Sequence, residues 1–469
     1  MRKRPDSETA RESRSSAGRY IPTPREAAAR TYARWIKRPS RIEYAAEWAL
    51  THGQWDSRDR ALFFELVYGV VRWHGRLQWL MGELSRRDPH SDALVYAATA
   101  VGMYQLLFLD RIPDYAAVDS AVDLTRRVAG PQAAAWTNAL LRRCAVEAVQ
   151  WKEAAPRTAN VAERLAASHS HPLWMLERWQ KRLAGEKLVE FLNWNNRRPD
   201  LYLRVSGRED SLSQAMLQLE KLEIGAEPAA IDPSFLKLQH SGDPAQIPLV
   251  RDGQAAIQDV SQGLVSRLLH PQPGERVLDL CAAPGGKTGH LAELCPDCRI
   301  VATDKSEERL RLVTEMASRR DYGNVSIRPF QEVIEEREPY DAVLVDAPCT
   351  GTGVLARRPD LRWRRKPDDV PRMAATQLKL LSYAESKVAL GGRIIYSTCS
   401  VEPEENLEVV NAFLQQHRGF GLETFSSNLD PGTLDEHGCL SYWGPELGAD
   451  GVFAAVLRRK PLIIKSLAG

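Results

Sequence analysis

The pattern of apolar and polar positions changes twice along the chain and divides it into three regions. Over residues 23–153, apolar residues recur at the three- and four-residue spacing of amphipathic helices. We therefore predict a helical domain over residues 21–160, preceded by a tail over residues 1–20. The clearest apolar faces are formed by Leu62, Phe63, Leu66, Val67, Val70 and Val71, and by Leu94, Ala98, Val101, Leu106 and Leu107.

The second region, residues 161–245, mixes helical and strand patterns. Leu201–Val205 alternates like a half-buried strand, whereas residues 174–183 and Leu212–Leu222 have helical spacing. The turn-rich stretch Ser241–Pro244 marks the end of this region. We predict a small α/β connecting domain.

In the third region, residues 246–463, short apolar runs alternate with helical patterns, which predicts a largely parallel sheet in an α/β, Rossmann-like domain. The expected strands are Val277–Leu280, Arg299–Thr303, Val325–Arg328, Ala342–Val345 and Arg393–Ser397, with a final pair near Gly421–Phe425 and Val452–Leu457.

Composition narrows the classes of function only slightly. The formal net charge of +2 means that any affinity for nucleic acid has to come from local clusters of basic residues. No apolar run approaches the roughly 18 residues that span a bilayer, so we expect no membrane segment. The tail carries Asp6, Glu8 and Glu12 and lacks the apolar stretch of a secretory signal. Seven cysteines argue against a disulfide framework and favour reduced thiols in the cytoplasm.

Three turns in the third region carry the candidate chemistry. Asp279–Thr288 is a glycine-rich turn between a strand and a helix, and Asp346–Cys349 and Ser397–Ser400 each place a cysteine after an apolar run. Turns at the carboxyl ends of parallel strands face one crevice, so these segments should converge there. A ligand cradle, a carboxylate and two thiols in one crevice point to covalent chemistry on a bound substrate.

The glycine turn does not match the common phosphate-binding motifs. A P-loop needs a glycine where Cys281 stands, and the G-x-G-x-x-G pattern of dinucleotide folds is absent. Gly285 and Gly286 allow close approach of the backbone to a ligand, and Asp304 ends the next strand, where a carboxylate can accept hydrogen bonds from ribose hydroxyls. An adenosine ligand without a pyrophosphate fits these features, and S-adenosylmethionine is such a ligand.

Taken in order, these motifs resemble the RNA (cytosine-5) methyltransferase family, particularly its bacterial 16S ribosomal RNA branch. The resemblance extends through Gly351–Val354, Arg358–Trp363 and Pro403–Asn406. Phe64–Trp73 is similar to the NusB-like RNA-binding domain at the N-terminus of that branch. The resemblance implies a multidomain fold: an all-α NusB-like domain, a small α/β connecting domain and a class I S-adenosylmethionine-dependent methyltransferase domain.

The resemblance also implies a role for each site residue. Cys399 is the nucleophile that adds to C6 of cytosine, Cys349 assists release of the methylated product, and Asp346 contacts the N3/N4 edge of the base. In the alternative used by DNA cytosine-5 enzymes, Cys349 attacks; the presence of both thiols favours the RNA family. A family aspartate that contacts adenine is replaced here by Gln331. The predicted cofactor residues are Cys281, Ala282, Ala283, Pro284, Gly285, Gly286, Lys287, Asp304, Gln331 and Asp346.

Basic residues after the first thiol turn are candidate RNA contacts, because cationic groups neutralise phosphates and Trp363 among them can stack on a base. A solvated surface loop is the alternative. Arg72, Arg142 and Arg143 are further candidates in the helical domain. The cluster after the thiol turn consists of Arg357, Arg358, Arg362, Arg364, Arg365, Lys366 and Arg372.

We expect no metal, because the lone pair Cys295 and Cys298 has no second cysteine or histidine pair nearby. The expected partner is RNA, either 16S rRNA or a small-subunit assembly intermediate, and the expected state is a monomer. The alternatives are a tRNA cytosine-5 methyltransferase and, in another class, a non-catalytic RNA-binding or assembly factor. The two placed thiols speak against a mere binding protein.

Overall fold

The computed structural model describes residues 22–85, 92–207, 209–239, 243–424, 429 and 433–461. The predicted tail, Phe425 and the end of the predicted catalytic domain lie outside these residues. The chain divides into two compact units, residues 1–154 and 155–469. Within the described part, no helix has both the length and the apolar character needed to cross a bilayer.

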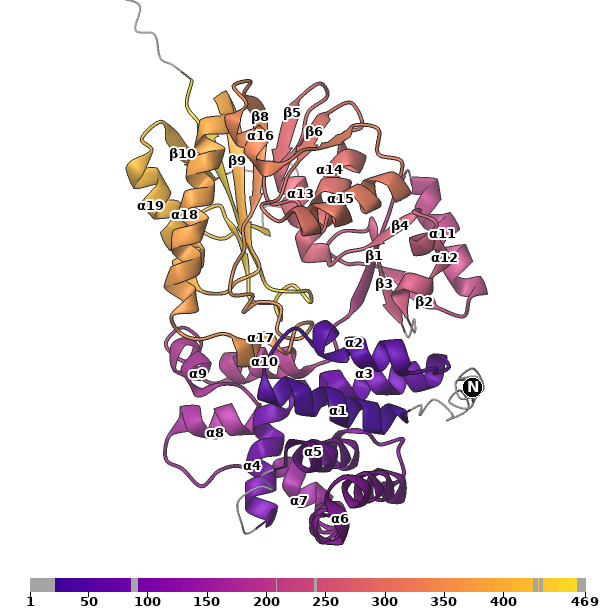
Figure 1. Ribbon diagram of the computed structural model, residues 1–469. Coiled ribbons are helices and arrows are strands. Elements are labelled where there is room, and N and C mark those ends of the chain that lie inside the picture. The colour runs from indigo at the N-terminus through magenta and orange to yellow at the C-terminus, as the bar shows by residue number, and fades with distance from the viewer. Residues whose placement is uncertain are drawn as a thin grey trace, which may run out of the picture. The chain divides into compact units, whose positions relative to one another are not determined.

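The first unit is helical throughout, as predicted (Figure 1). Side chains cap two of its longer helices at the N-terminus: Thr23 accepts from the backbone N–H of Glu26, and Asp92 accepts from that of Leu94. α5 is buried on almost every side and forms the centre of the unit. α6 bends at Gly130 (φ 83°), just before Pro131. The helices are α1 (Pro24–Lys37), α2 (Ile42–His52), α3 (Ser57–Arg72), α4 (His74–Ser85), α5 (Ala93–Phe108), α6 (Asp114–Val146) and α7 (Ala148–Glu153).

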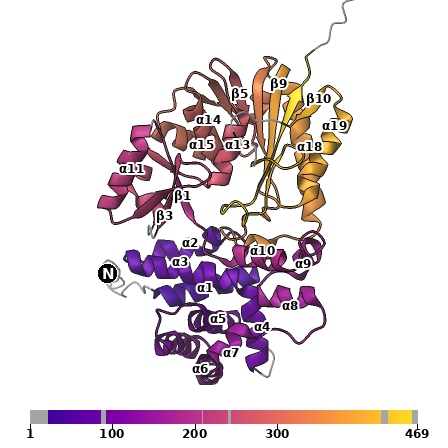
Figure 2. The ribbon, with the colours of Figure 1, turned by 180° about the vertical axis from the view of Figure 1, so that it is seen from behind.

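The second unit begins with three helices, followed by a four-stranded antiparallel sheet in the order β2-β3-β1-β4. α11 covers one face of this sheet, where Leu219 packs with Leu203 and Leu236 (Figure 2). β4 pairs with β1, so this sheet continues beyond the boundary predicted at residue 245. The elements are α8 (Val161–Ser168), α9 (Leu173–Trp179), α10 (Glu186–Asn196), β1 (Leu201–Val205), α11 (Glu209–Lys221), β2 (Gly225–Pro228), β3 (Phe235–Gln239), η1 (Pro244–Gln246), α12 (Pro248–Arg251) and β4 (Ala255–Ile257).

The remaining residues form an eight-stranded mixed sheet in the order β10-β12-β9-β8-β5-β6-β7, with β11 paired to β12. Strands β5 to β9 are parallel, whereas β12 is antiparallel to β9. The strand order reverses between β5 and β8, which is where open α/β sheets bind ligands. The strands are β5 (Arg276–Asp279), β6 (Arg299–Ala302), β7 (Val325–Ile327), β8 (Tyr340–Asp346), β9 (Val388–Thr398), β10 (Phe420–Glu423), β11 (Leu440–Tyr442) and β12 (Val452–Arg459).

Helices cover both faces of this sheet, which explains why its central strands are continuous apolar runs. α18 and α19 pack on the face that presents Val343 and Ile394, and α13 and α14 pack on the face that presents Leu344 and Ile395. The predicted strands and the Rossmann-like domain are confirmed. The helices are α13 (Val260–Leu269), α14 (Gly286–Leu294), α15 (Glu307–Arg319), α16 (Phe330–Glu335), α17 (Leu361–Arg364), α18 (Asp369–Lys387), η2 (Pro403–Glu405) and α19 (Leu407–Gln416).

Candidate active site

The two thiol turns lie side by side at the carboxyl ends of neighbouring parallel strands. Asp346, the last residue of β8, pairs with Ser397 on β9, so the turn that follows each strand starts at the same level of the sheet. This register brings Cys349 Sγ to 3.0 Å from Cys399 Sγ, although 50 residues separate them in the chain. Cys349 is buried, whereas Cys399 is half-buried.

An ion pair and a hydrogen bond link the glycine turn to the strands that lead into the thiol turns. Lys287 Nζ donates to Asp346 Oδ2 at 2.7 Å and also to the side-chain oxygen of Gln262. Asp346 Oδ1 accepts from Ser397 Oγ at 2.9 Å, which ties the carboxylate to β9. The side chain of Asp346 keeps 35% of its surface exposed, whereas that of Lys287 keeps only 9%. Asp346 is therefore open to solvent, and the more buried ammonium of Lys287 balances its charge.

The glycine turn joins β5 to α14, and the buried side chains of Asp279 and Thr288 pair with each other beneath it. Gly285 has a φ of 107°, a left-handed conformation that favours glycine, and it caps the N-terminus of α14. Asp279 at the end of β5 accepts from Thr288 Oγ1 at 2.7 Å. Its other oxygen, Oδ1, is buried and has no partner in the described residues. Burial raises the pKa of Asp279 to about 7.

Asp304 follows β6, next to the glycine turn. One of its oxygens accepts from the backbone N–H of Ala283 at 3.3 Å, and the other accepts from that of Ser306 at 3.0 Å. Arg309 lies 3.6 Å away and also donates to the carbonyl of Ala283 at 2.6 Å. The carboxylate predicted for a ribose therefore lies against the turn, where the carboxyl ends of β5 and β6 meet.

Gln331 lies elsewhere, on the exposed side of α16. Its amide nitrogen donates to Glu335 Oε1 at 2.5 Å, one helical turn further on. Its contact with adenine stays a prediction.

A buried carboxylate, which the sequence analysis did not identify, joins the two thiol turns. Glu405 in η2 accepts from the backbone N–H of Thr350 at 2.8 Å, from the Thr350 hydroxyl, and from Ser400 Oγ at 2.5 Å. Thr350 follows Cys349 and Ser400 follows Cys399, so one side chain holds the residue after each thiol. Gln377 donates to the same carboxylate at 3.2 Å. The only sequence signal was the position of Glu405 in the Pro403–Asn406 motif.

The two thiols differ in exposure, and the pKa of Cys349 is shifted. The hydrogen bond with Cys399, followed by burial, raises the pKa of Cys349 well above its ordinary value. Cys349 is therefore a thiol at neutral pH and can donate its proton to the sulfur of Cys399. Burial also raises the pKa of Cys281 in the glycine turn, which makes that thiol a poor nucleophile.

Most of the arginines predicted to contact RNA are held by the protein itself. Arg362 is fully buried and donates to the carbonyls of Ser170 and Asn195, both at 2.9 Å. Arg357 pairs with Asp259 and Asp450, each at 2.8 Å. The prediction is wrong for Arg362, which has no surface left to offer RNA. The side chain of Arg357 keeps 31% of its surface exposed, so its contact with RNA stays a prediction. The partners of both arginines are remote in the sequence and come together only in the fold.

Arg364, Arg365 and Arg372 are also engaged. Arg365 donates to the carbonyls of Cys349 and Thr350, both at 2.9 Å, and so braces the first thiol turn. Arg364 pairs with Asp360 at 2.8 Å, and Arg372 pairs with Asp369.

The N-terminal candidates are held in a similar way. Arg72 is buried, and Arg143 donates to the carbonyl of Leu84 at 3.2 Å and lies over the Trp151 ring. Arg142 donates to Asn138 at 2.9 Å. Arg142 is exposed and Arg143 is half-buried, so contact of either with RNA stays a prediction.

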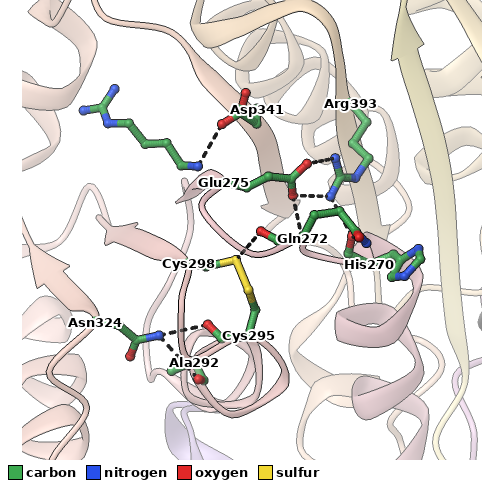
Figure 3. Close-up of a disulfide and its surroundings, with 10 residues drawn as sticks. His270, Gln272, Glu275, Ala292, Cys295, Cys298, Asn324, Asp341 and Arg393 are labelled. Atoms are coloured by element: carbon green, nitrogen blue, oxygen red, sulfur yellow. Dashed lines mark hydrogen bonds and ion pairs between the residues drawn. A yellow bond between two sulfur atoms is a disulfide. The ribbon is translucent and has the colours of Figure 1, made fainter.

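The expectation of reduced thiols is wrong for Cys295 and Cys298, which form a disulfide (Figure 3). The end of α14 turns directly into β6 and brings the two Cα atoms to 5.3 Å, within the range that a disulfide spans. Both cysteines are buried, and Asn324 donates to the Cys295 carbonyl at 3.1 Å. Among the described residues, no group of three or more histidine, cysteine or acidic side chains is arranged to hold a metal ion.

Comparison with known proteins agrees with this architecture. The model of the 16S rRNA methyltransferase RsmB/F family matches residues 266–458, and the ribosomal RNA small subunit methyltransferase B of an Escherichia coli strain is 33% identical over 86% of this chain and 91% of its own length. The chain belongs to the RsmB/F family of rRNA methyltransferases. The NusB family model matches residues 22–146, and the ferredoxin-like domain of RsmF/B-like methyltransferases matches residues 171–244.

Solved structures support the family fold. The crystal structure of PH0851 is 28% identical, covers 94% of this chain and 99% of its own, and superposes with a TM-score of 0.75. A methyltransferase homologue from Pyrococcus horikoshii is 25% identical, with a TM-score of 0.55 over 64% of this chain and all of its own. The predicted three-part fold of a NusB-like domain, a connecting domain and a methyltransferase domain is confirmed, and the protein is an rRNA methyltransferase by family.

Proposed function

We propose that this enzyme methylates C5 of a cytosine in 16S rRNA, using S-adenosylmethionine and a transient bond between Cys399 and C6 of the base. The observation that carries this proposal is the pair of sulfurs 3.0 Å apart beside the Asp346–Lys287 ion pair. Cytosine C5 is a weak nucleophile, and thiolate addition to C6 converts the ring into an enamine that can accept a methyl group at C5. An enzyme that methylates a ribose or an exocyclic amine needs no such thiol pair.

The glycine turn fits the proposed cofactor. A Cβ at Gly286 would meet only Gln258 Nε2, at 3.9 Å, so the turn leaves room for a ligand there. Asp304 can accept from ribose hydroxyls, and the unpartnered Oδ1 of Asp279 is available to a cationic amino group. Cys281–Lys287 would hold the methionine and ribose portions. When bound, S-adenosylmethionine supplies a methyl group on a positively charged sulfur.

The chain's own residues supply the nucleophile and the groups that stabilise the adduct. Cys399 loses its thiol proton to a base, the thiolate forms the S–C6 bond, and the C5=C6 electron pair shifts toward C4 and N3 of the ring. Lys287 is the cation available to stabilise the resulting negative charge, while Asp346 can accept from the amino group of the base. After methyl transfer, loss of the C5 proton to a base re-forms the double bond and breaks the S–C6 bond.

Cys349 acts in that last step. Because its pKa is raised, it keeps its proton and can donate a hydrogen bond to Cys399 Sγ as negative charge returns to that sulfur. The same property makes Cys349 a poor nucleophile, which favours Cys399 over the alternative in which Cys349 attacks.

The test incubates the protein and a radiolabelled methyl donor with three substrates from cells lacking it: free 16S rRNA, assembled small subunits and tRNA. We expect labelled 5-methylcytidine in 16S rRNA, identified by nucleoside mass spectrometry. Transfer to tRNA alone would identify a tRNA enzyme, and transfer to no RNA would contradict the proposal.

A further inference from the structure

A hollow of about 480 Å³ lies on the first unit, between the end of α1 and α2. Arginine and aromatic side chains line it: Arg34, Arg38, Tyr44, Trp48 and His52. None of these residues belongs to the catalytic crevice, and none supports the helical core except Trp48, which is half-buried.

The aromatic rings form a stripe along one face of α2. Tyr44, Trp48 and His52 are each four residues apart, a spacing that places successive side chains on the same face of a helix. The rings of Trp48 and His52 stack with centroids 4.9 Å apart and planes 21° apart. Trp48 and His52 therefore form a stack within the protein, and Tyr44 extends the stripe by one turn of the helix.

Arginines flank this stripe. The Arg34 guanidinium lies 4.8 Å from the centre of the Trp48 ring, and that of Arg41 lies 5.9 Å from the centre of the Tyr44 ring. Together with Arg38 they are exposed, and none forms an ion pair with a carboxylate in the described part of the chain. Glu47 also lines the hollow, which leaves an excess of positive charge there.

Tyr44 is the open end of the stripe. Its side chain is 65% exposed, so one of the largest aromatic surfaces of the unit has no packing partner that would exclude water. An aromatic ring that is exposed beside unpaired arginines suits a ligand with flat rings and negative charges. Single-stranded RNA has both, in its bases and its phosphates.

We propose that the surface formed by Arg34, Arg38, Arg41, Tyr44, Trp48 and His52 binds a single-stranded segment of RNA, with a base stacked on Tyr44 and phosphates paired with Arg38 and Arg41. The proposal rests on the proposed RNA substrate, and it adds an RNA-binding site on the first unit. A protein partner would instead be expected to bury an apolar centre, and this surface presents charged groups around every ring.

The test measures binding of the full-length protein to fluorescein-labelled single-stranded RNA, by anisotropy over a range of salt concentrations. Tyr44→Ala should weaken binding roughly tenfold, the scale on which one stacked base contributes. Arg38→Ala and Arg41→Ala should each reduce the slope of log K against log salt by about 0.7. Tyr115→Ala is the matched control, because Tyr115 is 70% exposed on α6 of the same unit.

Photo-crosslinking with 4-thiouridine RNA, followed by peptide mapping, locates the contact directly. Crosslinks within residues 34–52 would support the site. Unchanged binding by Tyr44→Ala and the arginine variants, with no crosslink there, would overturn it, even if the protein methylates RNA. Absence of methyl transfer to any RNA would instead count against the proposed function, so the two failures are distinguishable.

Discussion

Two cysteine pairs lie close together in this protein, and their surroundings give them different chemistry. Cys295 and Cys298 are three residues apart on one turn, are buried, and are joined by a disulfide. Cys349 and Cys399 come from two strands, are 3.0 Å apart without a bond, and one of them is half-buried at the crevice. The first pair connects two elements of the fold, whereas the second leaves one sulfur, that of Cys399, partly exposed.

More elements of the fold are needed to position the second pair than the first. One tight turn brings the first pair together. The second pair depends on the β8–β9 register, on Arg365 beneath one turn and on Glu405 between the two turns. The sulfurs of the first pair are therefore close because their residues are neighbours in the sequence. Those of the second pair are close only because the whole domain is folded.

The largest effect is expected when the nucleophile is removed. Cys399→Ala should lower methyl transfer at least about 10⁴-fold, because no S–C6 bond can form. Cys144→Ala removes a buried thiol in the first unit and is the control. Incorporation of labelled methyl groups into 16S rRNA measures both. Comparable activity of Cys399→Ala and the control would show that Cys399 is not the nucleophile.

Loss of the link between the thiol turns should have the next largest effect. Glu405→Gln keeps the shape of the side chain but turns an –NH₂ group toward groups that now donate to it. A shift of the thiols by about 1 Å can cost up to ~10²-fold in rate. We expect kcat to fall while the affinity for S-adenosylhomocysteine, measured by calorimetry, is unchanged.

Glu404→Gln is the matched control for that experiment. Glu404 is the preceding residue, is partly exposed, and pairs with Arg178 instead of the thiol turns. An equal loss of kcat in the two variants would mean that Glu405 has no special role in positioning the thiols.

Alkylation should separate the two thiols of the active site. Because the folded protein raises the pKa of Cys349, its thiolate forms only at higher pH than that of an ordinary cysteine. At a fixed pH well below the pKa, the thiolate fraction falls as the pKa rises, so Cys349 reacts more slowly than an ordinary cysteine. Cys349 is also buried, whereas Cys399 is half-buried and open to a reagent. Iodoacetamide near pH 7 should label Cys399 before Cys349, with labelling of Cys349 rising as the pH rises. Peptide mass spectrometry reports both sites, and faster labelling of Cys349 at neutral pH would contradict this order.

The smallest effect is expected at the disulfide. Replacing Cys295 and Cys298 by serine should leave methyl transfer unchanged, because neither sulfur reaches the crevice. Closure of so short a loop contributes about 2 kcal/mol to stability. The serine variant should therefore unfold at a lower temperature than the unaltered protein. A large fall in kcat with unaltered S-adenosylhomocysteine binding would give this pair a role in catalysis.

The sequence predicted those features that depend on neighbouring residues or on strand ends. The apolar runs of β5, β8 and β9 defined the sheet, and the turns after them located Asp346, Cys349 and Cys399. It did not predict the partners of Arg357 and Arg362, which come from segments about 90 to 190 residues away. An arginine-rich stretch has the same local pattern whether its side chains bind phosphate or their own protein. Glu405 was not predicted for the same reason, because the groups that donate hydrogen bonds to it come together only in the fold.

A covalent intermediate can be trapped if Cys399 bonds to the pyrimidine and Cys349 helps to break that bond. Cys349→Ala is incubated with S-adenosylmethionine and 16S rRNA, and the products are separated on a denaturing gel. We expect a covalent protein–RNA band for Cys349→Ala and none for Cys399→Ala or the double variant. A band that forms with Cys399→Ala but not with Cys349→Ala would contradict these roles of the two thiols.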